Sequence, residues 1–416
     1  MMTNASIMAT NYLPPISALK PALLFTASAT VTTIALHFPP KSHHLFLAPA
    51  WLLAACSLLS VDGENPSAPT GLDSYTAITS FLFLFILPTI LLGQSRLQAP
   101  SPNKKTKTPG FTRPSRQSIL AACAIWNNPR HLPSPRTTST TWPRRISFAI
   151  HRAAKATRIL LFDRWVIQRI RASLPADMLD FTPDKHALIR PLFYHLLTSC
   201  TYTSCPHPVL TTHQLQLRAF TVFSWLWSNY ALLQKYHAIL SVTFVLLGAD
   251  DPDHWPPLFG SPADAWTVQG FWGKFWHRIA SPTFIGFTRR VLGMKNDPRT
   301  MLEKLAVAFG VFCMSGVMHM AAAWRTGEGF THLDLFFFCA NFFAVVAEVV
   351  VMRVIFGLMK MAGSGPRVEG RLRRLGRGLG YVWVFAWFFW ATPRWLYPKI
   401  MRGLIKKALM EDRLGA

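Results

Sequence analysis

Acidic side chains are scarce in this chain, and charge of either sign is limited. Its 416 residues include 19 Asp and Glu against 43 Lys and Arg, which gives a formal net charge of +24; charged residues make up 15% of the total and hydrophobic residues 50%. A soluble protein of this length usually carries more charge. A basic balance is typical of nucleic-acid binding or of the loops of a membrane protein. Because the Lys and Arg residues lie between apolar runs, the sequence favours a membrane protein and argues against a nucleic-acid partner.

Cysteine is also sparse, and the six cysteines form no CxxC pair. Cys200 and Cys205 lie closest to a metal-binding spacing, but no matching His or Cys pair stands nearby, so we predict no metal site. The GxxxxGK, HExxH and GxSxG motifs are absent from the sequence as well. Their absence argues against P-loop nucleotide hydrolysis, zinc hydrolases of the HExxH type and α/β-hydrolase chemistry.

Long apolar runs, in contrast, are abundant. A helix crosses the hydrocarbon core of a bilayer with about 17–25 apolar residues, and a helix satisfies its own backbone hydrogen bonds in lipid. We therefore predict an all-α, multi-pass integral membrane protein of the endoplasmic reticulum with about 7–9 transmembrane helices. The candidate spans, of which 219–248 is one long or two short spans, lie near 21–38, 44–60, 75–93, 219–248, 301–324, 333–358 and 378–398.

The distribution of cations predicts the orientation of these spans. The loop 61–74 carries three acidic residues and no Lys or Arg, whereas 94–190 carries 18 Lys and Arg against four Asp. The positive-inside rule places 94–190 in the cytosol and 61–74, with the N-terminus, in the lumen. The basic stretches 360–377 and from Arg394 onward conflict with strict alternation, because a single apolar run separates them. Either that run re-enters the membrane, or 333–358 is not one simple span.

The region between the N-terminal spans and the remaining spans has two parts. Residues 94–145 are rich in Pro, Ser, Thr, Lys and Arg, which predicts disorder apart from a short surface helix at 118–126. Residues 146–172 mix apolar and Arg side chains, which predicts a basic amphipathic helix on an anionic membrane surface or, alternatively, a solvated connector. The predicted organisation is N-terminal transmembrane helices at 1–98, a basic cytosolic loop at 99–185 and a membrane-embedded core at 186–416.

An ionisable side chain stands in the middle of the apolar run 301–324. His319 lies within CMSGVMHMAAAW, and an ionisable residue inside a span is costly to bury, which by default indicates function. Ser315 lies one turn earlier, at i−4, where its hydroxyl could orient the imidazole. The alternative is a packing role, in which His319 hydrogen-bonds across helices. Ser315 and Gly316 are small enough to let a neighbouring helix approach closely.

The densest aromatic segment is WPPLFGSPADAWTVQGFWGKFWHRI, from Trp255 to Ile279. Interpreted as a helix from about Thr267, it places Gly273 and His277 at i, i+4 on one face. In that arrangement Gly273 leaves room beside His277. The alternative is an aromatic helix at the membrane interface in which His277 has no catalytic role.

The same helix would place Lys274 and Arg278 at i, i+4, where the pair could bind phosphates. Trp272 and Trp276 belong to the aromatic side chains that are typical of the membrane interface, past which an apolar substrate could arrive. These four residues are therefore candidates for substrate binding.

A histidine in apolar surroundings suits acyl transfer. Its unperturbed pKa is about 6.5, and burial keeps the imidazole neutral and able to accept a proton. His319 would take the proton of an alcohol as the alcohol oxygen attacks a thioester carbonyl. The thioester is already activated, so no acyl-enzyme is needed. His277 or a backbone N–H would donate to the developing oxyanion.

In this order and spacing, the motifs resemble a known family. WPPLFG, then FWGKFWH, then SGVMHMAAAW about forty residues later is similar to the wax-synthase domain, a relative of the membrane-bound O-acyltransferases, over about 190–400. IWNNPR, which ends at Arg130, is similar to a tryptophan/arginine segment upstream of that domain. The resemblance implies an O-acyltransferase that uses acyl-CoA as a cosubstrate, holds no bound cofactor and has His319 as its intramembrane catalytic histidine.

The resemblance also implies a substrate class. His277 matches the position after FWGxxW, where plant members tend to carry Asn. Fungal members with His at that position often acetylate terpenoid or meroterpenoid alcohols, which implies acetyl-CoA as the donor and secondary-metabolite biosynthesis as the setting. Met320 departs from the pattern, because an acidic residue commonly follows the family's histidine and would help to orient His319.

Other functions fit single features of the sequence. Long-chain wax-ester synthesis is the alternative within the same class. Asp250, Asp251 and Asp253 (DDPD) resemble the aspartates of UbiA-like membrane prenyltransferases, but the second acidic cluster that such chemistry needs is absent from the sequence, so we favour a loop turn. His319 in a polar pathway would suit a transporter, yet no internal repeat is visible. The predicted partners are therefore the lipid bilayer, acyl-CoA and a hydrophobic alcohol.

Overall fold

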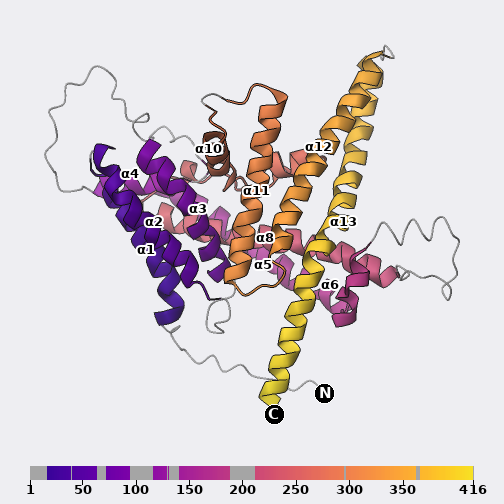
Figure 1. The fold of residues 1–416 in the computed structure, drawn as a ribbon, viewed down its shortest axis with the longest axis horizontal. Coiled ribbons are helices and arrows are strands. Elements are labelled where there is room, and N and C mark those ends of the chain that lie inside the picture. The colour runs from indigo at the N-terminus through magenta and orange to yellow at the C-terminus, as the bar shows by residue number, and fades with distance from the viewer. Residues whose placement is uncertain are drawn as a thin grey trace. The chain divides into compact units, whose positions relative to one another are not determined.

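The computed structural model describes a helical protein (Figure 1). The described residues contain no strand, so the predicted all-α class is confirmed for them. They are residues 16–38, 40–62, 72–93, 116–128, 130, 140–187, 211–294, 297–361 and 366–415. The chain divides into two compact units: Met1–Pro129 with Val317–Thr331 form unit 1, and Arg130–Gly316 with His332–Ala416 form unit 2. The predicted disorder in 94–115 and the cysteines Cys200 and Cys205 lie outside the described residues.

Unit 1 is a small helical bundle in which polar side chains join neighbouring helices. Buried Ser28 donates to the carbonyl of Ala50 (2.6 Å), and buried Ser57 donates to the carbonyl of Pro21 (2.7 Å) and pairs with Ser80 (2.8 Å). Small residues at such positions let helices approach closely, as is common in membranes. Its helices are α1 (Ile16–Ala35), η1 (Pro40–Ser42), α2 (His43–Ser60), α3 (Leu72–Gly93) and α4 (Arg116–Trp126), together with the C-terminal part of α11 (Met301–Arg325).

Unit 2 contains the remaining helices. Helices α12 and α13 run side by side (Figure 1), and the N-terminal part of α11 belongs to the same unit. The bounds are α5 (Trp142–Phe162), η3 (Asp163–Ile167), α6 (Gln168–Ser173), η4 (Met178–Phe181), η5 (Pro183–His186), α8 (Thr212–Leu246), η6 (Pro252–His254), η7 (Pro262–Asp264), α9 (Val268–Gly270), η8 (Phe271–Phe275), α10 (Ser281–Val291), α12 (His332–Met361) and α13 (Pro366–Gly415).

Four of the described helices are long and apolar enough to cross a membrane: His43–Ser60, Asp73–Leu92, Met301–Arg325 and His332–Ile355. They support an integral membrane protein, but the predicted count of about 7–9 spans is not confirmed. The predicted span at 21–38 is a shorter apolar helix, Leu19–Ala35. The predicted span at 219–248 overlaps α8 and that at 378–398 lies inside α13, and neither helix is among the four. Helix α8 carries polar residues, such as Arg218 and Gln234, that lower its hydropathy.

The predicted basic amphipathic helix at 146–172 is confirmed as a helix that extends from Trp142 to Ser173 with one π-helical turn, η3. Its inner face buries Ile159 and Ile167, whereas Ile150 and Trp165 are 62% and 57% exposed. That apolar outer face is what a helix at a membrane surface requires. The predicted short helix at 118–126 is also confirmed, as α4.

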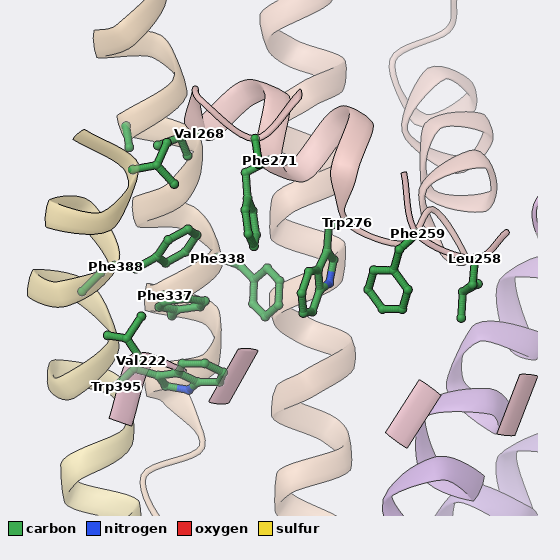
Figure 2. Packing of buried hydrophobic residues seen from close by; sticks show 14 residues of the cluster. Val222, Leu258, Phe259, Val268, Phe271, Trp276, Phe337, Phe338, Phe388 and Trp395 are labelled. Atoms are coloured by element: carbon green, nitrogen blue, oxygen red, sulfur yellow. The ribbon is translucent and has the colours of Figure 1, made fainter. Parts of the chain in front are cut away.

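An aromatic core fills unit 2. In Figure 2, Phe271, Trp276 and Phe259 lie beneath the segment that carries α9 and η8, next to Phe337 and Phe338 of α12. Trp276 stacks on Phe271 at a ring-centroid distance of 5.4 Å and an interplanar angle of 21°. Offset and edge-on ring contacts of this kind add to the free energy gained from burying the rings themselves. The core therefore holds the 255–279 segment against α12 and α13.

Two ion pairs at the N-terminal end of α5 give a test of the fold of unit 2. Arg145 pairs with Asp251 (2.5 Å) and donates to the carbonyls of Val245 and Asp250, with its side chain 15% exposed. Arg144 pairs with Asp253 (2.9 Å) but is 50% exposed. We expect Arg145→Met to destabilise the protein by about 3 kcal/mol, because it leaves Asp251 uncompensated. Arg144→Met should cost less than about 1 kcal/mol. Thermal unfolding in detergent measures both, and equal shifts in melting temperature would contradict this packing.

Candidate active site

The segment that carries the predicted site does not form the regular helix that we expected from Thr267. It contains the single turn α9 and the π-helical turn η8, and Trp276 then adopts an extended conformation (φ −66°, ψ 152°). The Trp276 N–H donates to the Phe271 carbonyl (2.7 Å), which closes the wider π turn. The prediction that Gly273 and His277, and likewise Lys274 and Arg278, share a helical face is therefore wrong.

A tertiary hydrogen bond accounts for the end of this helix. The Gly260 N–H donates to the Phe275 carbonyl at 2.8 Å, so this carbonyl serves the loop rather than a continuing helix. Only glycine fits at that point, since a Cβ on Gly260 would lie 2.2 Å from the Lys274 carbonyl oxygen. Gly273, in contrast, faces open space, because a Cβ there would meet nothing within 4 Å. Its predicted role of making room beside His277 is therefore not supported.

A pocket of about 470 Å³ lies where the loop before η7 meets η8. Trp276, Phe259 and Leu258 give it apolar walls, while Lys274 and Arg278 bring cations to it. The extended backbone at Trp276 returns Arg278 to the same pocket as Lys274 without a shared helical face. The described lining residues are Arg130, Pro257, Leu258, Phe259, Gly260, Ser261, Lys274, Trp276 and Arg278, and none of them is acidic.

Arg130 is the third cation of this pocket, from a point in the chain more than a hundred residues earlier. Burial and the neighbouring charge of Arg278 lower the pKa of Arg130 from its usual value, although a guanidinium stays protonated in proteins. Both guanidinium groups line the pocket, and because its described lining holds no carboxylate, their mutual repulsion is not compensated there. A bound anion would relieve this repulsion and accept hydrogen bonds from both.

The predicted aromatic residues have different environments. Trp276 is 7% exposed and packs against Phe259 at a centroid distance of 5.3 Å, so it forms a wall of the pocket. His277 contacts Phe259 edge-on at 5.7 Å and is partly buried, with its Nδ1 atom inaccessible to solvent. Trp272 faces α12 instead, where its indole N–H donates to Asn341.

A polar stripe on α12, which sequence reasoning missed, supports this segment. Asp334, Asn341 and Glu348 are spaced by seven residues, which places them along one face of the helix, and they are 2%, 0% and 8% exposed. Each accepts an indole N–H from α13: Trp395 donates to Asp334, Trp387 to Asn341 and Trp383 to Glu348, at 2.9–3.0 Å. The signal in the sequence is the heptad spacing of three polar residues inside an apolar run.

Two residues of this stripe also bind the 255–279 segment. Glu348 accepts the backbone N–H groups of Val268 (2.8 Å) and Gln269 (3.0 Å), which are the first residues of α9 and its turn. Asn341 accepts the Trp272 indole at 3.0 Å. The lowest rung, Asp334, instead pairs with Lys399 of α13 at 2.8 Å. The stripe therefore connects α12 to α13 along its length and to the candidate site at two of its three residues.

On α11, Ser315 and Gly316 belong to unit 2. The Ser315 hydroxyl donates to the Val311 carbonyl of its own helix at 2.8 Å. Gly316 packs closely against α12, as expected for a small residue, because a Cβ there would lie 2.8 Å from the Cα of Leu335. His319 lies one turn further along, in the part of α11 that belongs to unit 1. There it is partly buried, and Met318 beside it is 5% exposed.

The DDPD carboxylates are engaged in structural contacts. Asp251 and Asp253 pair with Arg145 and Arg144 of α5, and Asp250 accepts the indole N–H of Trp255 at 3.1 Å. These contacts favour the loop turn over a magnesium-binding role. Within the described residues, no group of three or more His, Cys, Asp and Glu side chains has a metal-binding arrangement.

Comparison with known proteins defines the class that this segment resembles. Residues 255–340 match the model of the membrane bound O-acyl transferase family. The resemblance inferred from the paired motifs is therefore confirmed. The matched region includes the pocket-lining loop, His277, His319, and the Asp334 end of the α12 stripe. No solved protein structure matches the chain.

Several curated relatives of this chain are named acetyltransferases. The chain is 32% identical over 190 residues to the acetyltransferase TRI7 of Fusarium sporotrichioides, which covers 42% of this chain and 41% of that protein. It is 29% identical over 194 residues to the acetyltransferase atnC of Arthrinium sp, covering 45% and 43%. The acetyltransferase eriL of Hericium erinaceus is 26% identical over 346 residues, covering 80% and 81%. The alignments with the first two span less than half of those proteins.

Proposed function

We propose that this protein is a membrane-bound O-acyltransferase that moves an acetyl group from acetyl-CoA to a hydroxyl of a terpenoid or meroterpenoid intermediate in secondary metabolism. The proposed core comprises residues 186–416, in the membrane of the endoplasmic reticulum. The family match over 255–340 and the acetyltransferase names of the relatives support the reaction class. Four apolar helices support the membrane setting, from which a hydrophobic alcohol would reach the enzyme.

The observation that carries the proposal is the basic pocket beside His277. Arg130, Lys274 and Arg278 line it, and Trp276, Phe259 and Leu258 supply its apolar walls. CoA is a polyanion with a slender thiol arm, so a site for it needs cations for the phosphates and an apolar path for the acyl thioester. Arginine in particular binds phosphate oxygens in a bidentate manner. A purely apolar alcohol would not need these three cations.

The proposed chemistry is a direct transfer. The alcohol oxygen attacks the thioester carbonyl, His319 accepts the hydroxyl proton, and the C–S bond breaks as the tetrahedral intermediate collapses. The CoA thiolate leaves and takes up a proton, and the acetyl ester remains on the acceptor. His277 donates a hydrogen bond to the oxyanion. Ser315, Trp272 and Trp276 are proposed to shape the approach of the substrates.

The cations at the pocket give the first test of this function. In the double variant Lys274→Gln, Arg278→Gln we expect KM for acetyl-CoA to rise about tenfold or more, because each lost charge-assisted hydrogen bond is worth roughly 1.5–3 kcal/mol. KM for the alcohol should change little. The ratio between variant and wild type should shrink as ionic strength rises. Steady-state kinetics on purified protein with both substrates varied measures these quantities.

A matched control removes two cations elsewhere. Arg402 and Lys407 are exposed residues of the α13 tail, so Arg402→Gln, Lys407→Gln should leave both KM values near wild type. If the pocket variant lowers protein abundance but keeps KM for acetyl-CoA unchanged, its cations serve topology and not the substrate. A parallel assay with long-chain acyl-CoA as the donor distinguishes acetyl transfer from wax-ester synthesis.

The second test concerns the proposed general base. His319→Ala should abolish acetyl transfer while membrane insertion and protein level stay near normal, because alanine cannot accept the hydroxyl proton. His44→Ala is the matched control, since His44 is an exposed histidine of α2, and it should retain full activity. Removal of a general base lowers a rate by roughly a hundredfold or more. Turnover by the His319→Ala protein at more than a few per cent of the wild-type rate would therefore exclude this role.

The third test concerns His277. We expect His277→Asn to keep measurable kcat, whereas His277→Ala should lose about a hundredfold more, because an amide still donates a hydrogen bond to an oxyanion and a methyl group does not. Single-turnover rates at saturating acetyl-CoA give the comparison. Equal losses in the two variants would indicate that His277 transfers a proton itself.

A further inference from the structure

We infer that Asn341 and Glu348 are positioning residues that hold the candidate site in place, and that they act through the segment rather than through helix pairing. This inference rests on the proposed function. We call the two residues, with their three hydrogen bonds to the segment and two to α13, the α12 clamp. Neither residue lines the pocket or belongs to the predicted site.

Glu348 and Asn341 are polar side chains buried in an apolar helix. Glu348 and Asn341 lie within His332–Ile355, one of the four helices able to cross a membrane, and they are 8% and 0% exposed. A carboxylate inside a span is expensive and marks a function by default. Helix pairing alone does not require a charge at this position, because a neutral acceptor would satisfy the indole of Trp383 equally well.

Besides the Trp383 indole, Glu348 binds two backbone N–H groups of the segment. Its Oε2 accepts the Gln269 N–H, and its Oε1 accepts the Val268 N–H. A carboxylate offers an acceptor on both oxygens, whereas the amide of glutamine offers only one. The two parallel N–H groups at the start of α9 therefore select Glu over Gln. This preference is a property of the segment and not of α13.

The clamp connects to the pocket through the segment. Glu348 fixes the backbone at the start of α9, Asn341 fixes Trp272 four residues later, and the Gly260–Phe275 hydrogen bond fixes the end of η8. Lys274 and Trp276, which line the pocket, lie between or directly after these points, and His277 follows. Displacement of a reacting group by about 1 Å can reduce a rate about a hundredfold. Release of the clamp would therefore displace the site without removing any group from it.

The structure offers a matched set of variants for the test. Glu348→Gln and Trp272→Phe weaken the clamp on the segment side, and Trp272→Phe keeps an aromatic ring in place, so it provides the test if Glu348→Gln fails to fold. Trp383→Phe and Trp387→Phe remove the α13 donors to the same two acceptors and leave the segment contacts intact. Both pairs remove hydrogen bonds to the same two buried acceptors, Asn341 and Glu348, so a loss of stability at these acceptors affects both pairs.

We expect Glu348→Gln and Trp272→Phe to lower kcat for acetyl transfer about a hundredfold with KM for acetyl-CoA within about threefold of wild type. Trp383→Phe and Trp387→Phe should keep kcat within about threefold of wild type. Hydrogen–deuterium exchange in detergent gives a second readout that needs no activity. The amides of 268–278 should exchange faster in Glu348→Gln but not in Trp383→Phe, because only the former loses a partner of these amides.

Two results would overturn the inference: equal kcat losses in all four variants, which would assign the stripe to α12–α13 pairing, or unchanged exchange of 268–278 in Glu348→Gln. Hydrogen–deuterium exchange also distinguishes failure of the clamp from failure of the proposed function. If the wild-type protein transfers no acetyl group, the proposed function fails, while faster exchange in Glu348→Gln alone would still support the clamp.

Discussion

Hydrogen-bond acceptors buried in one apolar helix, α12, determine how α13 and the 255–279 segment pack against it. Asp334, Asn341 and Glu348 accept three indole N–H groups from α13, and the last two also accept donors of the 255–279 segment. An unpaired buried donor costs roughly 1–3 kcal/mol, and lipid offers no water to replace the lost partner. Aromatic packing alone would allow α13 and the segment to slide. The acceptors, spaced two helical turns apart, allow one register.

The register has a consequence for electrostatics. Glu348 of α12 holds the start of α9, and the segment then closes a π-helical turn and extends at Trp276. The extended backbone returns Arg278 to the pocket that Lys274 also lines. Arg130 arrives from a distant part of the chain, and the described lining of the pocket holds no acidic residue to neutralise these cations. Arg130 is partly buried, which strengthens its interaction with a bound charge relative to water, whereas Lys274 and Arg278 are exposed. The pocket is consequently suited to a polyanionic substrate with an apolar arm, as acyl-CoA is.

Sequence patterns predicted the helical class, the amphipathic helix at 146–172 and the family resemblance, because each depends on local periodicity or on motif spacing. The regular helix from Thr267 was wrong, since the Gly260–Phe275 hydrogen bond is a tertiary contact that no local pattern encodes. The apolar run at 219–248 suggested a span, but α8 also carries polar residues such as the buried Gln234 and is not among the four helices apolar enough to cross a membrane. Glu348 was missed for the same reason, because its charge is diluted in the apolar run 333–358. Lys274 and Arg278 were paired for the wrong geometric reason, yet both line one pocket.

The central claim is that this pocket binds the phosphates of acyl-CoA, and direct binding of CoA to purified protein tests it most directly. Arg130 is the best residue to change, because it is far in sequence from both proposed catalytic histidines and lies outside the matched region 255–340. At low ionic strength, Arg130→Gln should raise the Kd for CoA about tenfold, Arg130→Lys should raise it less, and the difference from wild type should narrow as salt is added. A Kd for CoA that is the same in wild type and Arg130→Gln at every salt concentration would contradict the account.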